Sequence, residues 1–177
     1  MVNTAKPHAG TRHCSAIRRP AWVALAFTLM IPAASADSFT GRVVEVADGD
    51  TLTLLVGRQH HKIKIAAIDA PERYQAWGDQ ARTNLSRLAL SQTAVADCPR
   101  LDHRSALYIC KLTVDTLDIG IEQIKDGMAW WFRGDAHQQS AEAQSAYGSA
   151  ELLAKLRRQG LWRDTNPVPP WNFRGER

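Results

Sequence analysis

Residues 48–72, DGDTLTLLVGRQHHKIKIAAIDAPE, decide the fold, because they read as a turn, two short strands and a second turn. The pair Asp48-Gly49 lies between runs of alternating apolar residues. This is a strong hairpin signal, since a two-residue hairpin turn needs backbone with positive φ. The sequence therefore predicts an antiparallel β structure that begins around this turn.

Each of the two strands carries a carboxylate at one end of its apolar face, because side chains alternate along a strand. The face of the first strand comprises Asp50, Leu52, Leu54 and Val56, and that of the second Ile63, Ile65, Ala67 and Asp69. Burying an unpaired carboxylate is costly, so two of them at the ends of apolar faces indicate a bound cation. Glu72 is a third carboxylate within reach of Asp69.

A purely structural interpretation of the same residues is also open. Asp50 could begin a strand at the rim and stay hydrated, and Asp69-x-x-Glu72 matches a capping box at a helix start. Pro71 argues against the cap, since it disfavours helical backbone at Ala70.

The order of several motifs resembles the thermonuclease (staphylococcal nuclease-like) family. DGDT at 48–51 is followed by IDAPE at 68–72, and then by GMAW at 127–130, GLW at 160–162 and PPW at 169–171. Each motif is weak alone, but their order and spacing are specific. The resemblance covers residues 41–174, nearly the whole chain after its first 36 residues.

The resemblance implies an enzyme that hydrolyses DNA and RNA phosphodiesters with calcium. Asp50 and Asp69 would bind Ca²⁺ together with the backbone carbonyl of Ala70 and waters, which suits a hard cation that prefers oxygen ligands. Glu72 would be the general base that takes a proton from the attacking water, or would at least position that water. Calcium against a phosphate oxygen would lower the cost of the developing charge.

The chain departs from the family at its two catalytic arginines. Lys64 stands where the first is expected, and strand alternation alone puts Lys64 on the face opposite Asp69. The second is expected at Ala106 or Leu107, neither of which can bind phosphate; Arg104 could substitute if the turn is shortened. Arginine donates two parallel hydrogen bonds to phosphate, whereas lysine is a point charge.

An aromatic residue of the family stacks on a nucleic-acid base, and Trp131 or Phe132 would do so here. Stacking tolerates any base sequence. The alternative is that these rings belong to the core, since alternation in an extended segment buries some of them. Trp162 and Trp171 are expected to pin the C-terminal segment onto the domain.

Residues 1–36 have the features of a cleaved secretory signal peptide. They contain four basic residues and no acid, an apolar run at 21–31 and a final Ala34-Ser35-Ala36. The alternative is a membrane anchor, but the run is too short to span a bilayer. The four basic residues account for the whole formal net charge of +4, so residues 37–177 are neutral. The mature chain thus lacks the basic excess of a high-affinity nucleic-acid binder.

Cys98 and Cys110 remain after the leader is removed. An even pair of cysteines in an exported protein indicates a disulfide, and the alternative is two buried thiols. Residues 37–177 are long enough for one domain with its own core.

The predicted elements fit an α+β protein that is mainly a β barrel. Strands are expected at 39–46, 51–56, 61–68, 93–97 and 107–114, with extended chain at 129–132. Helices are expected at 78–90, 117–125 and 141–159. This order fits a five-stranded Greek-key barrel of the OB-fold type with about three helices.

Two functions therefore remain open. The first is an exported calcium-dependent nuclease of low sequence specificity, acting as a periplasmic or secreted monomer with no membrane contact after signal cleavage. The second is a catalytically inactive nuclease-like domain that binds nucleic acid or another partner. The intact Asp50, Asp69 and Glu72 favour the nuclease, and the missing arginines favour the binding domain.

Overall fold

The computed structural model describes residues 1–2 and 37–175 of the chain. Ala34–Arg177 forms one compact unit, and the other unit, Met1–Ala33, lies almost wholly outside the described residues. The predicted signal peptide at 1–36 likewise falls outside them. Within the described part, no helix has the length and apolar character needed to span a bilayer.

Five strands close into a barrel, as the sequence predicts. They are β1 (Asp37–Val46), β2 (Thr51–Val56), β3 (Gln59–Ile65), β5 (Thr93–Asp102) and β6 (Leu107–Val114). Antiparallel pairs run in the order β3-β2-β1-β5-β6, and a parallel pairing of β3 with β6 closes the barrel. Closure leaves no free edge along most of the sheet.

The barrel interior is filled by the alternate apolar residues of these strands. Leu52, Leu54, Ile63, Ile65, Ala96 and Leu112 are all at most 1% exposed. A β-bulge between Val43 and Glu45 increases the bend of β1, which helps the strands to curve around the core.

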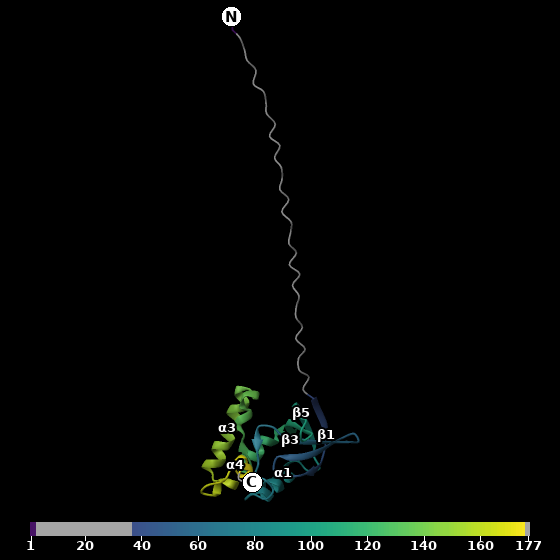
Figure 1. Ribbon diagram of the computed structural model, residues 1–177, viewed down its shortest axis with the longest axis vertical. Coiled ribbons are helices and arrows are strands. Elements are labelled where there is room, and N and C mark those ends of the chain that lie inside the picture. The colour runs from purple at the N-terminus through teal and green to yellow at the C-terminus, as the bar shows by residue number, and fades with distance from the viewer. Residues whose placement is uncertain (3–36, 176–177) are drawn as a thin grey trace. The chain divides into compact units, whose positions relative to one another are not determined.

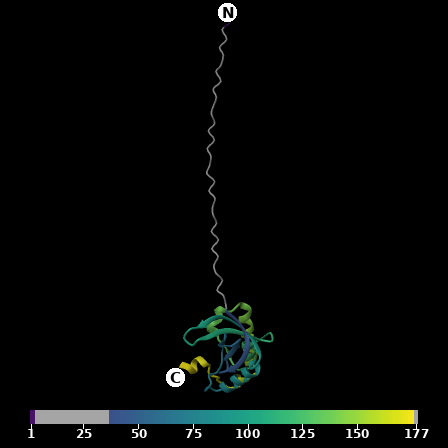
Figure 2. The same cartoon turned by 90° about the vertical axis from the view of Figure 1, so that its right-hand side faces the viewer.

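The helices flank the barrel (Figures 1 and 2). They are α1 (Gly78–Ala89), α2 (Ile119–Lys125), α3 (Ala141–Leu156) and the short C-terminal α4 (Pro170–Gly175), with 3-10 turns at Arg133–Gln138 and Gly160–Arg163. The apolar side of α1, with Ala81, Leu85 and Ala89, packs into the core. Two-residue strands β4 (Ile68–Asp69) and β8 (Trp130–Trp131) pair with each other, and β7 (Leu117–Asp118) pairs antiparallel with the end of β6.

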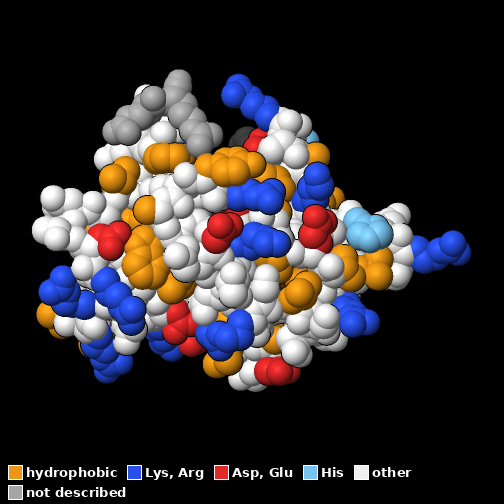
Figure 3. Space-filling model, turned by 90° about the horizontal axis from the view of Figure 1, so that it is seen from below, with side chains coloured by type: hydrophobic (Ala, Val, Ile, Leu, Met, Phe, Trp, Pro, Cys, Tyr) orange, Lys and Arg blue, Asp and Glu red, His pale blue; other side chains and the backbone are white. Residues whose placement is uncertain are grey.

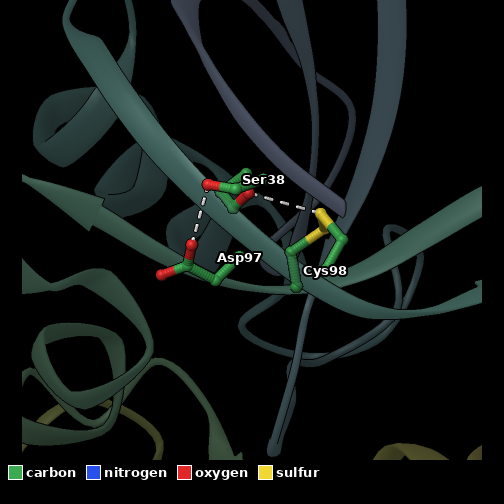
Figure 4. The surroundings of a disulfide bond; sticks show 5 residues. Ser38, Asp97 and Cys98 are labelled. Carbon is green, nitrogen blue, oxygen red and sulfur yellow. Dashed lines mark hydrogen bonds between the residues drawn. A yellow bond between two sulfur atoms is a disulfide. The ribbon is translucent and has the colours of Figure 1, made fainter. Parts of the chain in front are cut away.

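The predicted disulfide is confirmed. Cys98 on β5 and Cys110 on β6 are bonded, with their Cα atoms 4.0 Å apart. In Figure 4 the bridge lies next to Asp97, whose carboxylate accepts a hydrogen bond from the Ser38 hydroxyl at 2.9 Å. The bridge therefore ties β5 to β6, two neighbouring strands of the barrel.

Two details of residues 48–72 differ from the prediction. Neither Asp48 nor Gly49 has positive φ; the left-handed glycine of this region is Gly57, between β2 and β3. Gly49 is needed instead for close packing, because an added Cβ would lie 2.6 Å from the Cβ atoms of Ala70 and Ala81. The third strand ends at Ile65 rather than at residue 68, because Ala67 adopts a left-handed φ of 65°.

Candidate active site

Asp50 lies just before β2 and is only 4% exposed. Its Oδ2 accepts hydrogen bonds from the Ala70 backbone N–H at 3.0 Å and from Lys64 Nζ at 2.7 Å, and its Oδ1 accepts one from the Thr51 hydroxyl at 2.9 Å. Burial pushes its pKa up, but Lys64 and these hydrogen bonds outweigh burial and leave the pKa below its ordinary value. Asp50 is thus a buried, charged carboxylate.

Asp69 is held beside it by the β4–β8 pairing, which places Asp69 opposite Trp130. Asp69 is also 4% exposed, and its Oδ1 lies 3.7 Å from the same Lys64 nitrogen that contacts Asp50. The two carboxylates therefore flank one ammonium group. The positive φ of Ala67 re-aims the chain so that Asp69 reaches Lys64, which unbroken strand alternation would not allow.

Lys64 is one-third exposed and bridges the two aspartates. Burial acts to lower its pKa, but the charges of Asp50 and Asp69 outweigh burial and leave the pKa raised. Lys64 therefore stays protonated at neutral pH.

Glu72 lies in the loop after β4 and is more open, with a side chain that is 36% exposed. Its backbone N–H donates to the Gln75 side chain at 3.0 Å. Its Oε1 accepts a hydrogen bond from Arg174 Nη1 at 2.6 Å. A carboxylate in this position can accept a proton from a molecule bound in front of it.

Arg174 reaches this group from α4, at the opposite end of the sequence. Its Nη2 donates to Asp69 Oδ2 at 2.6 Å, and its Nη1 donates to Asp69 Oδ1 at 3.2 Å as well as to Glu72. The hydrogen bonds to Asp69 and Glu72 raise the pKa of Arg174 above its ordinary value.

Negative charge is in excess at this group. Among the described residues, the cations that pair with Asp50, Asp69 and Glu72 are Lys64 and Arg174. Asp48 lies next to them through a 3.0 Å hydrogen bond from the Asp50 N–H. Burial, followed by the charge of Asp50, raises the pKa of Asp48 to about 6. The excess charge and the hard oxygen ligands suit a divalent cation such as Ca²⁺. The described residues contain no cluster of three or more His, Cys, Asp or Glu arranged to hold a metal by themselves.

A cavity of about 700 Å³ opens beside this group. Its charged lining includes Lys64, Asp69, Arg100, Arg104 and Arg174. In Figure 3, basic and acidic side chains lie side by side in the middle of the visible face, with hydrophobic side chains around them. Three aspartates, Asp69, Asp102 and Asp135, also line the cavity, so its walls carry both signs of charge. The lysine and arginines in the lining can hold the anionic phosphate of a phosphodiester while a proton is removed from water.

Comparison with known proteins identifies the family. The family described as staphylococcal nuclease homologue matches residues 62–164. The chain belongs to the staphylococcal nuclease homologue family. It is 34% identical over 151 residues to an uncharacterized endonuclease of Haemophilus influenzae, covering 85% of this chain and 80% of the relative. It is 32% identical over 160 residues to a micrococcal nuclease of Shigella flexneri, covering 86% and 90% of the two chains.

The predicted arginine substitutes lie in different settings. Lys64 lies within the carboxylate group, although strand alternation predicted the opposite face. Ala106 has a left-handed φ of 55° in the turn before β6, and Leu107 begins that strand. Arg104 lies in the same turn, fully on the surface, and also lines the cavity. Its backbone N–H donates to Asp102 Oδ1 at 3.1 Å, which helps to fix the backbone of the turn.

The two predicted stacking residues are also separated by the structure. Phe132 lines the cavity with Lys64 and Asp69. Trp131 does not line it; its indole N–H donates to Gln139 at 3.0 Å, and Arg133 covers its ring at 4.4 Å. The geometry therefore favours Phe132 and not Trp131 as a base-stacking residue.

Arg174 is the main residue that the sequence prediction missed. The PPW motif at 169–171 indicated an anchored C-terminal segment, and the arginine three residues after Trp171 lies on the helix that this motif begins. That spacing was the available signal, but nothing local to Arg174 shows that its partners lie 105 and 102 residues away.

Proposed function

We propose that this protein is an exported, calcium-dependent nuclease that hydrolyses phosphodiester bonds of DNA and RNA with low sequence specificity. The observation that carries the proposal is the group of Asp50, Asp69 and Glu72 beside a cavity whose lining includes a lysine and three arginines. The names of the two relatives, an endonuclease and a micrococcal nuclease, support the same reaction class.

The residues that would hold Ca²⁺ are Asp50, Asp69 and the carbonyl of Ala70. Support comes from the two buried carboxylates on either side of Lys64 and from the excess of negative charge around them. Calcium, when bound, supplies positive charge that stabilises the phosphate as charge develops on it. Few protein ligands leave room for water and for the substrate.

Glu72 is the proposed general base. Its partial exposure lets a water molecule approach its carboxylate, and a positioned base of this kind contributes about a hundred- to ten-thousandfold in rate. Lys64 lines the cavity as a positive charge held by Asp50, and Arg104 offers an exposed guanidinium from the turn before β6. Neither Lys64 nor Arg104 supplies the fixed pair of parallel N–H donors that a buried arginine would give to phosphate, so we expect slow turnover.

Phe132 is the proposed platform for a base, since it lines the same cavity. Contacts with the phosphate backbone and a stacking ring do not read the base sequence, which supports low specificity. Export to the periplasm or the medium follows from the leader sequence, and the disulfide is consistent with an oxidising compartment. We propose a monomer as the working form.

Cleavage of single-stranded DNA by the purified protein, in calcium and in chelator, tests the proposal. We expect cleavage that calcium supports and chelator stops. Binding without cleavage in calcium would contradict it and would favour the nucleic-acid-binding function, for which the neutral charge of residues 37–177 and Lys64 are the supporting observations.

A further inference from the structure

We propose that Arg174 is a positioning residue of the reaction centre, holding the Glu72 carboxylate against Asp69, so that turnover requires the C-terminal helix α4. This inference rests on the proposed function. It concerns a segment that lies outside the region matched by the family, which ends at residue 164.

The hydrogen bonds of Arg174 join two carboxylates, those of Asp69 and Glu72. Its two terminal nitrogens donate in parallel to both oxygens of Asp69, and Nη1 also donates to Glu72. A guanidinium has five N–H donors in a fixed plane, so one side chain can hold two carboxylates at a set separation.

The helix that carries Arg174 is itself fixed. Pro170 is buried at the start of α4, and proline favours the first turn of a helix. The Trp171 ring lies 6.3 Å from that of Trp130 and 5.9 Å from that of Phe132. Trp130 is the strand partner of Asp69, so the same strand pair supports both ends of the Arg174–Asp69 contact.

Gln75 makes a second connection between the C-terminal segment and the Glu72 loop. Its Oε1 accepts the Glu72 N–H at 3.0 Å, and its Nε2 donates to the Val168 carbonyl at 2.5 Å. The Gln75 side chain is largely buried, which makes this link directional and costly to lose. Glu72 is therefore held through its backbone by Gln75 and through its carboxylate by Arg174, both tied to residues 168–174.

Kinetics of Arg174→Gln test the role. We expect kcat on single-stranded DNA to fall by about ten- to a hundredfold, the usual loss for a residue that orients a site residue, with KM changed by less than about threefold. Arg174→Lys should recover only part of the loss, because lysine lacks the parallel N–H donors. Arg157→Gln, which removes the same charge from the exposed end of α3, is the matched control and should equal wild type.

Hydrogen–deuterium exchange in chelator gives a measurement that does not depend on activity. Arg174→Gln should accelerate exchange in residues 70–77 without lowering the melting temperature of the barrel, and Arg157→Gln should not. Unchanged exchange, or a kcat equal to or above wild type in Arg174→Gln, would overturn the inference. An inactive wild type in calcium would instead overturn the proposed function, while faster exchange in Arg174→Gln would still support the positioning of Glu72 by Arg174.

Discussion

Among the described residues, the single carboxylate of Glu151 and the three carboxylates of the candidate active site are each paired with two cations, and this difference separates a structural arrangement from a functional one. Glu151 on α3 is 1% exposed. Its Oε1 accepts the Trp131 N–H at 3.1 Å, and its Oε2 accepts Arg133 at 2.8 Å and Lys155 at 2.9 Å. One carboxylate thus has two cations and a backbone donor, and its hydrogen bonding is complete.

The carboxylates of the candidate active site have the opposite balance. Three of them, Asp50, Asp69 and Glu72, share Lys64 and Arg174, and they lie beside the cavity that Glu151 does not line. A carboxylate whose charge is fully compensated by its cations, as that of Glu151 is, contributes to stability alone. An excess of carboxylates at a cavity raises local repulsion, which a bound cation relieves, and is therefore typical of a site.

Glu72→Gln should produce the largest effect in this comparison. The amide cannot take a proton from water, so kcat on single-stranded DNA should fall by about a hundred- to ten-thousandfold. Its melting temperature should stay near that of wild type, because Glu72 is partly exposed. If Glu72→Gln retained most of the activity, Glu72 would not be the base.

Lys64→Arg should sharpen the comparison by placing a planar guanidinium, with two parallel N–H donors, in the candidate active site. Lys64 lines the cavity, and a planar donor there should stabilise the transition state more than the ground state. We expect turnover to rise by about ten- to a hundredfold. Steady-state kinetics would show this as a change in kcat, and unchanged kcat would mean that charge at this position does not limit the rate.

Glu151→Gln should show the converse pattern, with a loss of stability and retained activity. The amide still accepts the Trp131 N–H but loses the charged hydrogen bonds with Arg133 and Lys155. We expect the free energy of unfolding to fall by about 1–3 kcal/mol. Urea denaturation measures this decrease. A large loss of kcat without a loss of stability would contradict the purely structural role of Glu151.

The smallest expected effect is the change with pH of the difference in unfolding free energy between wild type and Glu151→Gln. Burial acts to raise the pKa of Glu151, but Arg133 and Lys155 outweigh it and hold the pKa below its ordinary value. A lowered folded-state pKa stabilises the protein above the unfolded-state pKa, about 4.3, and this stability is lost as pH falls through the folded-state value. The difference in unfolding free energy between wild type and Glu151→Gln should therefore shrink below about pH 4. A difference that is constant with pH would contradict the charged role of Glu151.

The sequence predicted the barrel and the carboxylates at the ends of its apolar faces because strand alternation and the pairing of neighbouring strands show in local patterns. The disulfide was predicted on a different ground, the even pair of cysteines left after the leader. Alternation placed Lys64 on the wrong face because the pattern does not reveal the left-handed residue Ala67 that ends β3.

Arg174 was beyond such reasoning. Its contact with Asp69 closes a loop of 105 residues, and no period in the sequence encodes that distance. The separation of Phe132 from Trp131 was likewise unpredictable, because it depends on how α3 packs. The Trp131 backbone N–H donates to Glu151 on α3, and its indole N–H donates to Gln139, just before α3.

Calorimetric titration with calcium tests the central claim most directly, that the excess of carboxylates at the cavity binds a divalent cation. Wild type should bind one Ca²⁺, weakly in the absence of substrate because few ligands come from the protein. Asp50→Asn, which preserves an acceptor for the Ala70 N–H, should abolish the binding, and Glu151→Gln should leave it unchanged. Identical titrations for wild type and Asp50→Asn would contradict the account.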